Sequence, residues 1–178
     1  MSGVRDSYPQ AYVEYLVQFH GGRDYFECHE ILEEYWKEHP DSPYRETWVM
    51  FIQLAVSLYH ERRGNRVGAV KLMEGAIRRF NAEHMSQLGV DGNQLLAMMR
   101  KRLDELRSEP RSPYADLNIP IIDEQLAVRC RERAEELGHI FGQASDMSDT
   151  YLLNRHKLRD REAARQARQA ALEERKHD

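Results

Sequence analysis

The residues with the clearest chemical potential lie in one short stretch, DYFECHEILEEYWKEH, which spans residues 24–39. His29 and Glu33 are four residues apart, so on a helix they occupy the same side, one turn from each other. A helical wheel places this pair at the edge of the apolar stripe of the helix, beside Trp36. An imidazole and a carboxylate at this spacing can form a hydrogen-bonded network or supply two ligands to a metal ion.

A second polar group lies in the next predicted helix, residues 47–63, which is otherwise apolar almost all the way round. Gln53, Ser57 and His60 follow one another there at intervals of four and three residues, which aligns them on one side. A buried polar group without a partner costs about 1–3 kcal/mol, so this line implies polar groups opposite it. Helices joined by a short turn usually pack antiparallel, and we therefore expect the His–Glu pair of the preceding helix to face this line.

The two groups together form a predicted pocket of six residues. These are His29, Glu33, Trp36, Gln53, Ser57 and His60. The first interpretation is a buried network in which the carboxylate orients a histidine. The second is a site for a divalent metal ion (zinc, iron or manganese) held by His29, Glu33 and His60, because two histidines and a carboxylate form several such centres. The spacing also arises by chance and no HExxH motif is present, which favours the network.

The composition restricts the class of protein. With 178 residues, 41% of them hydrophobic and 31% charged, the chain suits one globular domain, with room for an appendage. The N-terminal residues lack the features of a secretory signal, and the longest apolar stretch is too short for a membrane span. Cys28 and Cys130 are too few for a disulfide framework and form no CxxC motif. We therefore expect a cytoplasmic protein that does not bind a membrane.

The net charge of −4 is spread unevenly along the chain. Residues 155–178 carry eight Lys or Arg against five Asp or Glu, a net charge of +3, so residues 1–154 carry −7. This balance does not indicate nucleic-acid binding, which usually requires a stronger basic surface. Glu30 and Glu34 point away from the apolar stripe of their helix, and we interpret them as part of a solvated surface.

The last segment of the chain has a distinct composition. From residue 159 onward it is rich in Ala, Arg, Glu and Gln, which favour a helix, but it contains few large apolar residues to bury. We expect a charged C-terminal helix that projects or packs on a partner chain. We therefore predict that this helix forms the contact in a homo-oligomer or in a complex with another protein.

Prolines, glycines and capping residues divide the chain into predicted helices, and the expected fold is therefore all-α. The architecture is a bundle of antiparallel helix hairpins, about four to six helices, plus the charged C-terminal helix. An extended connection is expected at residues 108–120, which contain three prolines, and a close helix crossing at Gly68 and Gly75. The helices are expected at residues 9–20, 25–39, 47–63, 66–85, 94–107 and 123–141, with a last one from about 148. Asp24 and Asn65 are the expected N-caps of the second and fourth of these.

Two segments, YFECHEILEEYW and FIQLAVSLYHERRGNRVGAVKLME, resemble the DUF309 family of helical proteins without an assigned function. The family pattern F-E-x-H-E-x-x-E-x-x-W is matched in the first segment and Q-x-A-x-x-x-x-H-x-x-R-G-N in the second. The matching residues are Phe26, Glu27, His29, Glu30, Glu33, Trp36, Gln53, Ala55, His60, Arg63, Gly64 and Asn65. The match covers about residues 9–85, and YADLNIP at 114–120 is similar to the family's closing segment. The resemblance implies a helical family domain over residues 1–120 and a C-terminal helical extension over 121–178.

Three hypotheses about function follow. The first is a non-enzymatic cytoplasmic helical domain whose polar His/Glu pocket takes a small ligand or a protein partner. The alternative is a metal-dependent, hydrolase-like enzyme in which His29, Glu33 and His60 hold a divalent ion and Glu30 or Gln53 orients the activated water. The third is a structural assembly protein without any such site. The sequence leaves open whether the protein is an enzyme.

Overall fold

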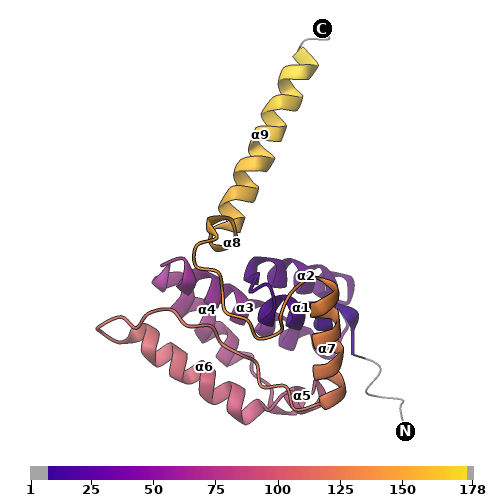
Figure 1. Cartoon of the computed structure of the whole chain (residues 1–178), viewed down its shortest axis with the longest axis vertical. Helices are drawn as coiled ribbons and strands as arrows, with labels where there is room; N and C mark the ends of the chain where they lie inside the picture. The colour runs from indigo at the N-terminus through magenta and orange to yellow at the C-terminus, as the bar shows by residue number, and fades with distance from the viewer. Residues whose placement is uncertain (1–7, 176–178) are drawn as a thin grey trace. The chain divides into compact units, whose positions relative to one another are not determined.

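The computed structural model describes residues 8–175, apart from the side chains of residues 156–164 and 167, and it confirms the all-α fold class (Figure 1). The helices, in chain order, are α1 (Gln10–His20), α2 (Tyr25–Glu38), α3 (Arg45–Arg62), α4 (Arg66–Arg78), α5 (Ala82–Gln87), α6 (Gly92–Arg107), α7 (Glu124–Glu136), α8 (Thr150–Leu153) and α9 (Arg155–Arg175). Residues 8–175 contain no strand, only an isolated bridge between Val90 and Ile121. The chain divides into two compact units after Ser145.

Capping side chains explain where several helices begin. Asp24 accepts a hydrogen bond from the Glu27 amide at 3.1 Å, and Asn65 accepts one from the Gly68 amide at the same distance. Such caps satisfy backbone donors that the first helical turn leaves unpaired. Both caps were predicted from the sequence and are confirmed.

Two predicted helix ends are wrong. The helix expected to continue to residue 85 ends at Arg78, because Asn81 caps a separate helix, α5, by accepting a hydrogen bond from the His84 amide at 3.0 Å. The helix expected to reach residue 141 ends at Glu136, two residues before Gly138, which has a φ of +77°. Glycine adopts this left-handed conformation without a steric penalty and so ends the helix.

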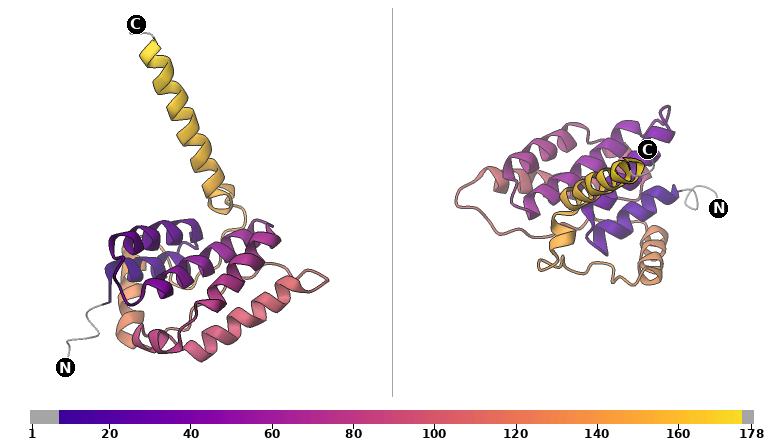
Figure 2. Two further views of the ribbon diagram at one scale, coloured as in Figure 1. Left: turned by 180° about the vertical axis from the view of Figure 1, so that it is seen from behind. Right: turned by 90° about the horizontal axis from the view of Figure 1, so that it is seen from above.

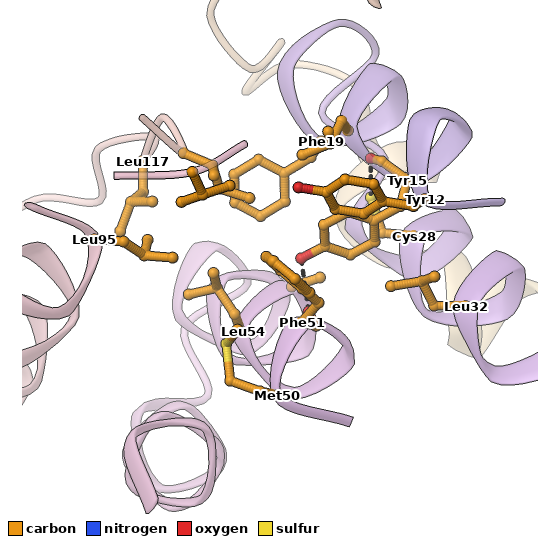
Figure 3. Packing of buried hydrophobic residues seen from close by; sticks show 14 of the residues in the cluster. Tyr12, Tyr15, Phe19, Cys28, Leu32, Met50, Phe51, Leu54, Leu95 and Leu117 are labelled. Atoms are coloured by element: carbon orange, nitrogen blue, oxygen red, sulfur yellow. Dashed lines mark hydrogen bonds between the residues drawn. The ribbon is translucent and has the colours of Figure 1, made fainter. Parts of the chain in front are cut away.

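The core of the first unit is built around α1, whose aromatic side chains are fully buried (Figure 3). The Tyr12 hydroxyl donates to the Leu88 carbonyl at 2.8 Å, and the Tyr15 hydroxyl donates to the Phe51 carbonyl at 2.6 Å. Each bond lets a tyrosine bury its ring without leaving its hydroxyl unpaired. Helix α1 packs against α2 and α7, α3 lies between α2 and α4, and α4 lies beside α6 (Figures 1 and 2).

The first compact unit extends beyond the predicted family domain. Helix α7 buries Leu126 and Cys130, and the Tyr8 hydroxyl donates to Asp123 at 2.7 Å just before this helix. Because α7 contacts α1, residues 121–145 belong to the same unit as the preceding helices. The predicted division after residue 120 therefore does not coincide with the boundary of the compact unit.

A buried arginine joins segments that lie far apart in the sequence. Arg23 is 1% exposed and has a φ of +53° in the short link between α1 and α2. Its side chain donates to the Gln143 carbonyl at 2.8 Å, the Leu117 carbonyl at 3.0 Å and the Asn118 side chain at 2.6 Å. The guanidinium thus connects the α1–α2 link to both long connections that flank α7.

A second buried arginine, Arg62, extends this network. It donates to the Arg23 carbonyl at 2.7 Å, and its guanidinium lies 4.5 Å from the centroid of the Tyr25 ring. Asp116, 4.0 Å from Arg23, accepts hydrogen bonds from the backbone and side chain of Ser145. Burial raises the pKa of the Asp116 carboxyl, but these bonds and the charge of Arg23 outweigh burial and leave it below its ordinary value.

We expect Arg23→Ala to lower the free energy of unfolding by about 3–5 kcal/mol, because it leaves several buried acceptors unpaired. Denaturant unfolding of the full chain measures this change. Arg131→Ala is the matched control, since Arg131 forms an exposed ion pair with Glu124, and exposed pairs contribute about 0–1 kcal/mol. Similar losses in both variants would contradict the assigned role of Arg23.

His20 provides a second buried link, between α1 and the extended segment. Its Nδ1 lies 2.8 Å from the Leu16 carbonyl oxygen, and its Nε2 lies 2.9 Å from the Ile119 amide nitrogen. Because a carbonyl only accepts and an amide only donates, the ring is neutral, with its proton on Nδ1. Burial lowers the pKa of His20 to about 4.

The stability of the fold should therefore depend on pH through His20. Between pH ~6.5 and ~4 the unfolded state binds the proton and the folded state does not, so the free energy of unfolding falls by about 3 kcal/mol as pH falls through this range. Denaturant unfolding at several pH values measures the slope. His20→Gln should flatten it, whereas replacing the exposed His39 by glutamine should not. An unchanged slope in His20→Gln would refute the assignment.

Candidate functional site

The predicted His–Glu pair lies on a half-exposed side of α2. His29 Nε2 is 2.9 Å from Glu33 Oε2, and the two side chains are 28% and 32% exposed. His29 Nδ1 lies 3.5 Å from Glu30 Oε1, and the Lys37 ammonium lies 3.2 Å from Glu33 Oε1. The pairing of residues four apart on one helix is therefore present, as part of a row of polar side chains partly open to solvent.

Aromatic side chains flank this row. The Phe26 ring lies 5.8 Å from the His29 ring and 6.2 Å from the Tyr59 ring of α3. Trp36 is half-buried, and the Arg45 guanidinium lies 5.5 Å from its ring centroid. The Trp36 Nε1 atom is shielded from solvent and has no hydrogen-bond partner in the described part of the chain. We call Phe26, His29, Glu30, Glu33 and Trp36 the α2 surface.

The polar line of α3 lies against α4. The Ser57 hydroxyl donates to the Ala69 carbonyl at 2.7 Å, and Gln53 accepts from Arg79 at 3.2 Å. His60 Nδ1 lies 3.3 Å from the side-chain nitrogen of Asn65, the residue that caps α4. The expectation that this line faces the His–Glu pair is therefore wrong.

The physical reason is that α3 packs against two helices on different sides. Toward α2 it presents aromatic residues: the Tyr35 ring lies edge-on to Trp48, with centroids 5.7 Å apart. Toward α4 it presents the polar line, where the missing side chain of a glycine allows close approach. A Cβ atom at Gly75 would lie 2.9 Å from the amide group of Gln53. Both α2 and α4 are joined to α3 by short links. Adjacency in sequence therefore does not indicate which of the two helices faces the polar line.

The predicted metal ligands are not assembled into one site. His29 and Glu33 pair on α2, whereas His60 lies beside the start of α4. Within residues 8–175, no three His, Cys, Asp or Glu side chains among those described are grouped so that they could hold a metal ion. The hydrolase hypothesis, which needs this ligand set, receives no support from the geometry.

Sequence reasoning missed the concentration of acidic residues around α2. Residues 24–46 contain eight Asp or Glu and only two Lys or Arg. This excess accounts for most of the negative charge of the chain before its basic end, and a local count of charges would have found it. Glu30 and Glu34, interpreted as an ordinary solvated surface, belong to this acidic region.

We expect Gly75→Val to lower the free energy of unfolding by about 1 kcal/mol, because the added side chain displaces the Gln53 amide from its hydrogen bond with Arg79. Thermal or denaturant unfolding measures the loss, and Lys71→Val, at an exposed position of the same helix, is the control. Adding Gln53→Ala should recover part of the stability by making room. A double variant with simply additive losses would show that Gln53 and position 75 do not compete for space.

None of the described helices is both long enough and apolar enough to cross a membrane.

The comparisons with known proteins give a family but no activity. The family model described as "Domain of unknown function (DUF309)" matches residues 12–72, a stretch that contains all six residues of the predicted pocket. The chain is also similar to the "Uncharacterized protein YpuF" of Bacillus subtilis (strain 168). The identity is 46% over 171 residues, covering 95% of this chain and 97% of the relative. No solved structure matches the chain. The chain belongs to the DUF309 family.

Proposed function

We propose that the chain is a non-enzymatic cytoplasmic binding domain whose α2 surface holds an arginine-bearing segment of a protein partner. The observation that carries the proposal is the position of two half-exposed carboxylates, Glu30 and Glu33, beside the half-buried rings of Phe26 and Trp36. Carboxylates bind a guanidinium through charge-assisted hydrogen bonds, and aromatic faces attract it through cation–π interactions. Arginine is the side chain that uses both kinds of group.

The protein's own arginines illustrate this chemistry at the same surface. Arg45 lies over Trp36 at 5.5 Å, and Arg63 lies over the Tyr59 ring at 5.7 Å, next to Phe26. A partner arginine could exchange with Arg45, which is exposed. The excess of acidic residues over 24–46 would speed the approach of a basic partner.

The state of the cysteines supports binding rather than nucleophilic catalysis. Both Cys28 and Cys130 are free and buried. Burial raises the pKa of the Cys28 thiol well above its usual value and that of Cys130 to about 12. Since the thiolate is the nucleophile, both groups are inert near neutral pH.

The C-terminal helix is a second candidate contact with a protein, either a second copy of the chain or another partner. From Arg165 onward, each described side chain of α9 is exposed, and Leu172 is 52% exposed. A helical segment whose described side chains are all exposed obtains little stability from packing, and a partner would supply that packing. This helix is proposed only as an assembly element, separate from the α2 surface.

The test of the α2 surface uses a labelled helical peptide of Ala-Ala-Arg-Gln repeats, titrated into the full chain at low salt. We expect Glu30 and Glu33 of the α2 surface and the neighbouring exposed Glu34, changed together to glutamine, to weaken binding by about tenfold, since each lost ion pair contributes up to about 1 kcal/mol. Binding should also weaken when ionic strength rises from about 0.05 M to about 0.3 M. A peptide of Ala-Ala-Glu-Gln repeats should not bind.

The matched control removes three exposed charges from α7 by changing Glu132, Glu135 and Glu136 to glutamine. This variant should bind the arginine peptide as tightly as the wild-type chain does. Equal weakening in the two triple variants would mean that only the overall charge attracts the peptide, and the proposal would fail. Trp36→Leu, which keeps an apolar side chain but removes the aromatic face, should weaken binding without a change in salt dependence.

A further inference from the structure

A cavity of about 110 Å³ lies in the first compact unit, away from the α2 surface. The end of α3, the start of α4, the last turns of α6 and residues 111–115 line it, and it is open to solvent on one side. Three arginines, two glutamates and several apolar side chains line it. We propose that this cavity binds a small organic acid, with one carboxylate and a short apolar body. The proposal is independent of the function proposed for the α2 surface.

Two of the three arginines in the cavity wall form ion pairs with glutamates. Arg102 forms ion pairs with both glutamates of the lining, at 2.9 Å from Glu61 and 3.7 Å from Glu105. The Arg102 and Glu61 side chains are only 11% and 13% exposed, so this pair forms a fixed and neutralised part of the wall. A carboxylate ligand does not need to displace it.

Arg66 holds the end of α6 against the start of α4. Its guanidinium donates to the carbonyls of Leu106 and Ser108 and forms an ion pair with Glu109 at 2.6 Å. Arg111 remains: it is exposed, lines the cavity, and forms no ion pair with a carboxylate in residues 8–175 as described. Arg111 is therefore the arginine of the described lining that is available to bind an anion.

The backbone adds a second attraction for an anion. Gly64 and Arg66, which line the cavity, flank Asn65, the N-cap of the 13-residue helix α4. The N-terminus of a helix carries partial positive charge and favours a carboxylate nearby. Arg111 and the backbone at the start of α4 are the two features of the lining that favour an anionic group.

The rest of the lining determines the class of ligand. Leu106, Pro113 and the ring of Tyr114 present apolar surface to the cavity. A cavity of ~110 Å³ accommodates about ten non-hydrogen atoms, since a cavity needs roughly 10–15 Å³ to hold one water molecule. A nucleotide or a peptide is too large, whereas a monocarboxylate with a short aliphatic chain or a single ring fits.

The experiment titrates benzoate, benzyl alcohol and inorganic phosphate separately into the full chain, followed by calorimetry and by the fluorescence or NMR signals of the protein. We expect benzoate to bind at least about tenfold more tightly than the other two, because only benzoate has both the charge and the ring. Arg111→Gln should weaken benzoate binding by about tenfold. Arg100→Gln, at an exposed position of α6 outside the lining, should leave it unchanged.

A second variant tests whether the ligand must enter the cavity or only needs its charged side chains. Ala115→Trp keeps every charge but fills the cavity, and benzoate should no longer bind, while the thermal midpoint of the variant confirms that it is folded. Phosphate binding as tightly as benzoate would overturn the apolar part of the proposal. Benzoate binding that survives Arg111→Gln or Ala115→Trp, or no benzoate binding to the wild-type chain, would overturn the site itself. Loss of the cavity site leaves the α2 surface untouched, so the two proposals fail independently.

Discussion

The first compact unit depends on the burial of one guanidinium, that of Arg23. A charge in a protein interior is tolerated only when it is paired and hydrogen-bonded. Arg23 satisfies this condition with acceptors from residues 117, 118 and 143, about a hundred positions further along the chain. The need of this buried guanidinium for hydrogen-bond acceptors therefore determines where two long connections without regular structure must lie.

Arg62 and Asp116 extend the hydrogen-bond network around Arg23. Arg62 caps the carbonyl of Arg23, and Asp116 receives hydrogen bonds from Ser145, the last residue of the unit. The Tyr114 hydroxyl donates to Asp116 at 2.7 Å, and the Tyr25 hydroxyl lies 2.7 Å from the Tyr114 hydroxyl and 3.1 Å from Asp116. Since Tyr114 also lines the cavity between α3, α4 and α6, the proposed acid-binding site and the buried network share one residue.

The two candidate binding surfaces arise in different ways. The α2 surface is a local product of one amphipathic helix, whose charged side stays half-exposed because its apolar side packs on α1 and α3. The cavity is lined by four separate segments of the chain. It exists only because the extended segment after α6 folds back and buries Leu117 and Ile119. The charge pattern of the sequence can indicate the α2 surface, but no local sequence pattern indicates the cavity.

The sequence by itself determined the all-α class, most helix starts, the caps at Asp24 and Asn65, and the pairing of His29 with Glu33. These features depend on residues within one or two turns of each other, which periodicity and capping chemistry describe. Only the tertiary structure decided that the line of Gln53, Ser57 and His60 meets α4, which separated the predicted pocket into two groups. The reason is that a central helix has two sequence neighbours, and its own pattern cannot tell which one faces its polar side.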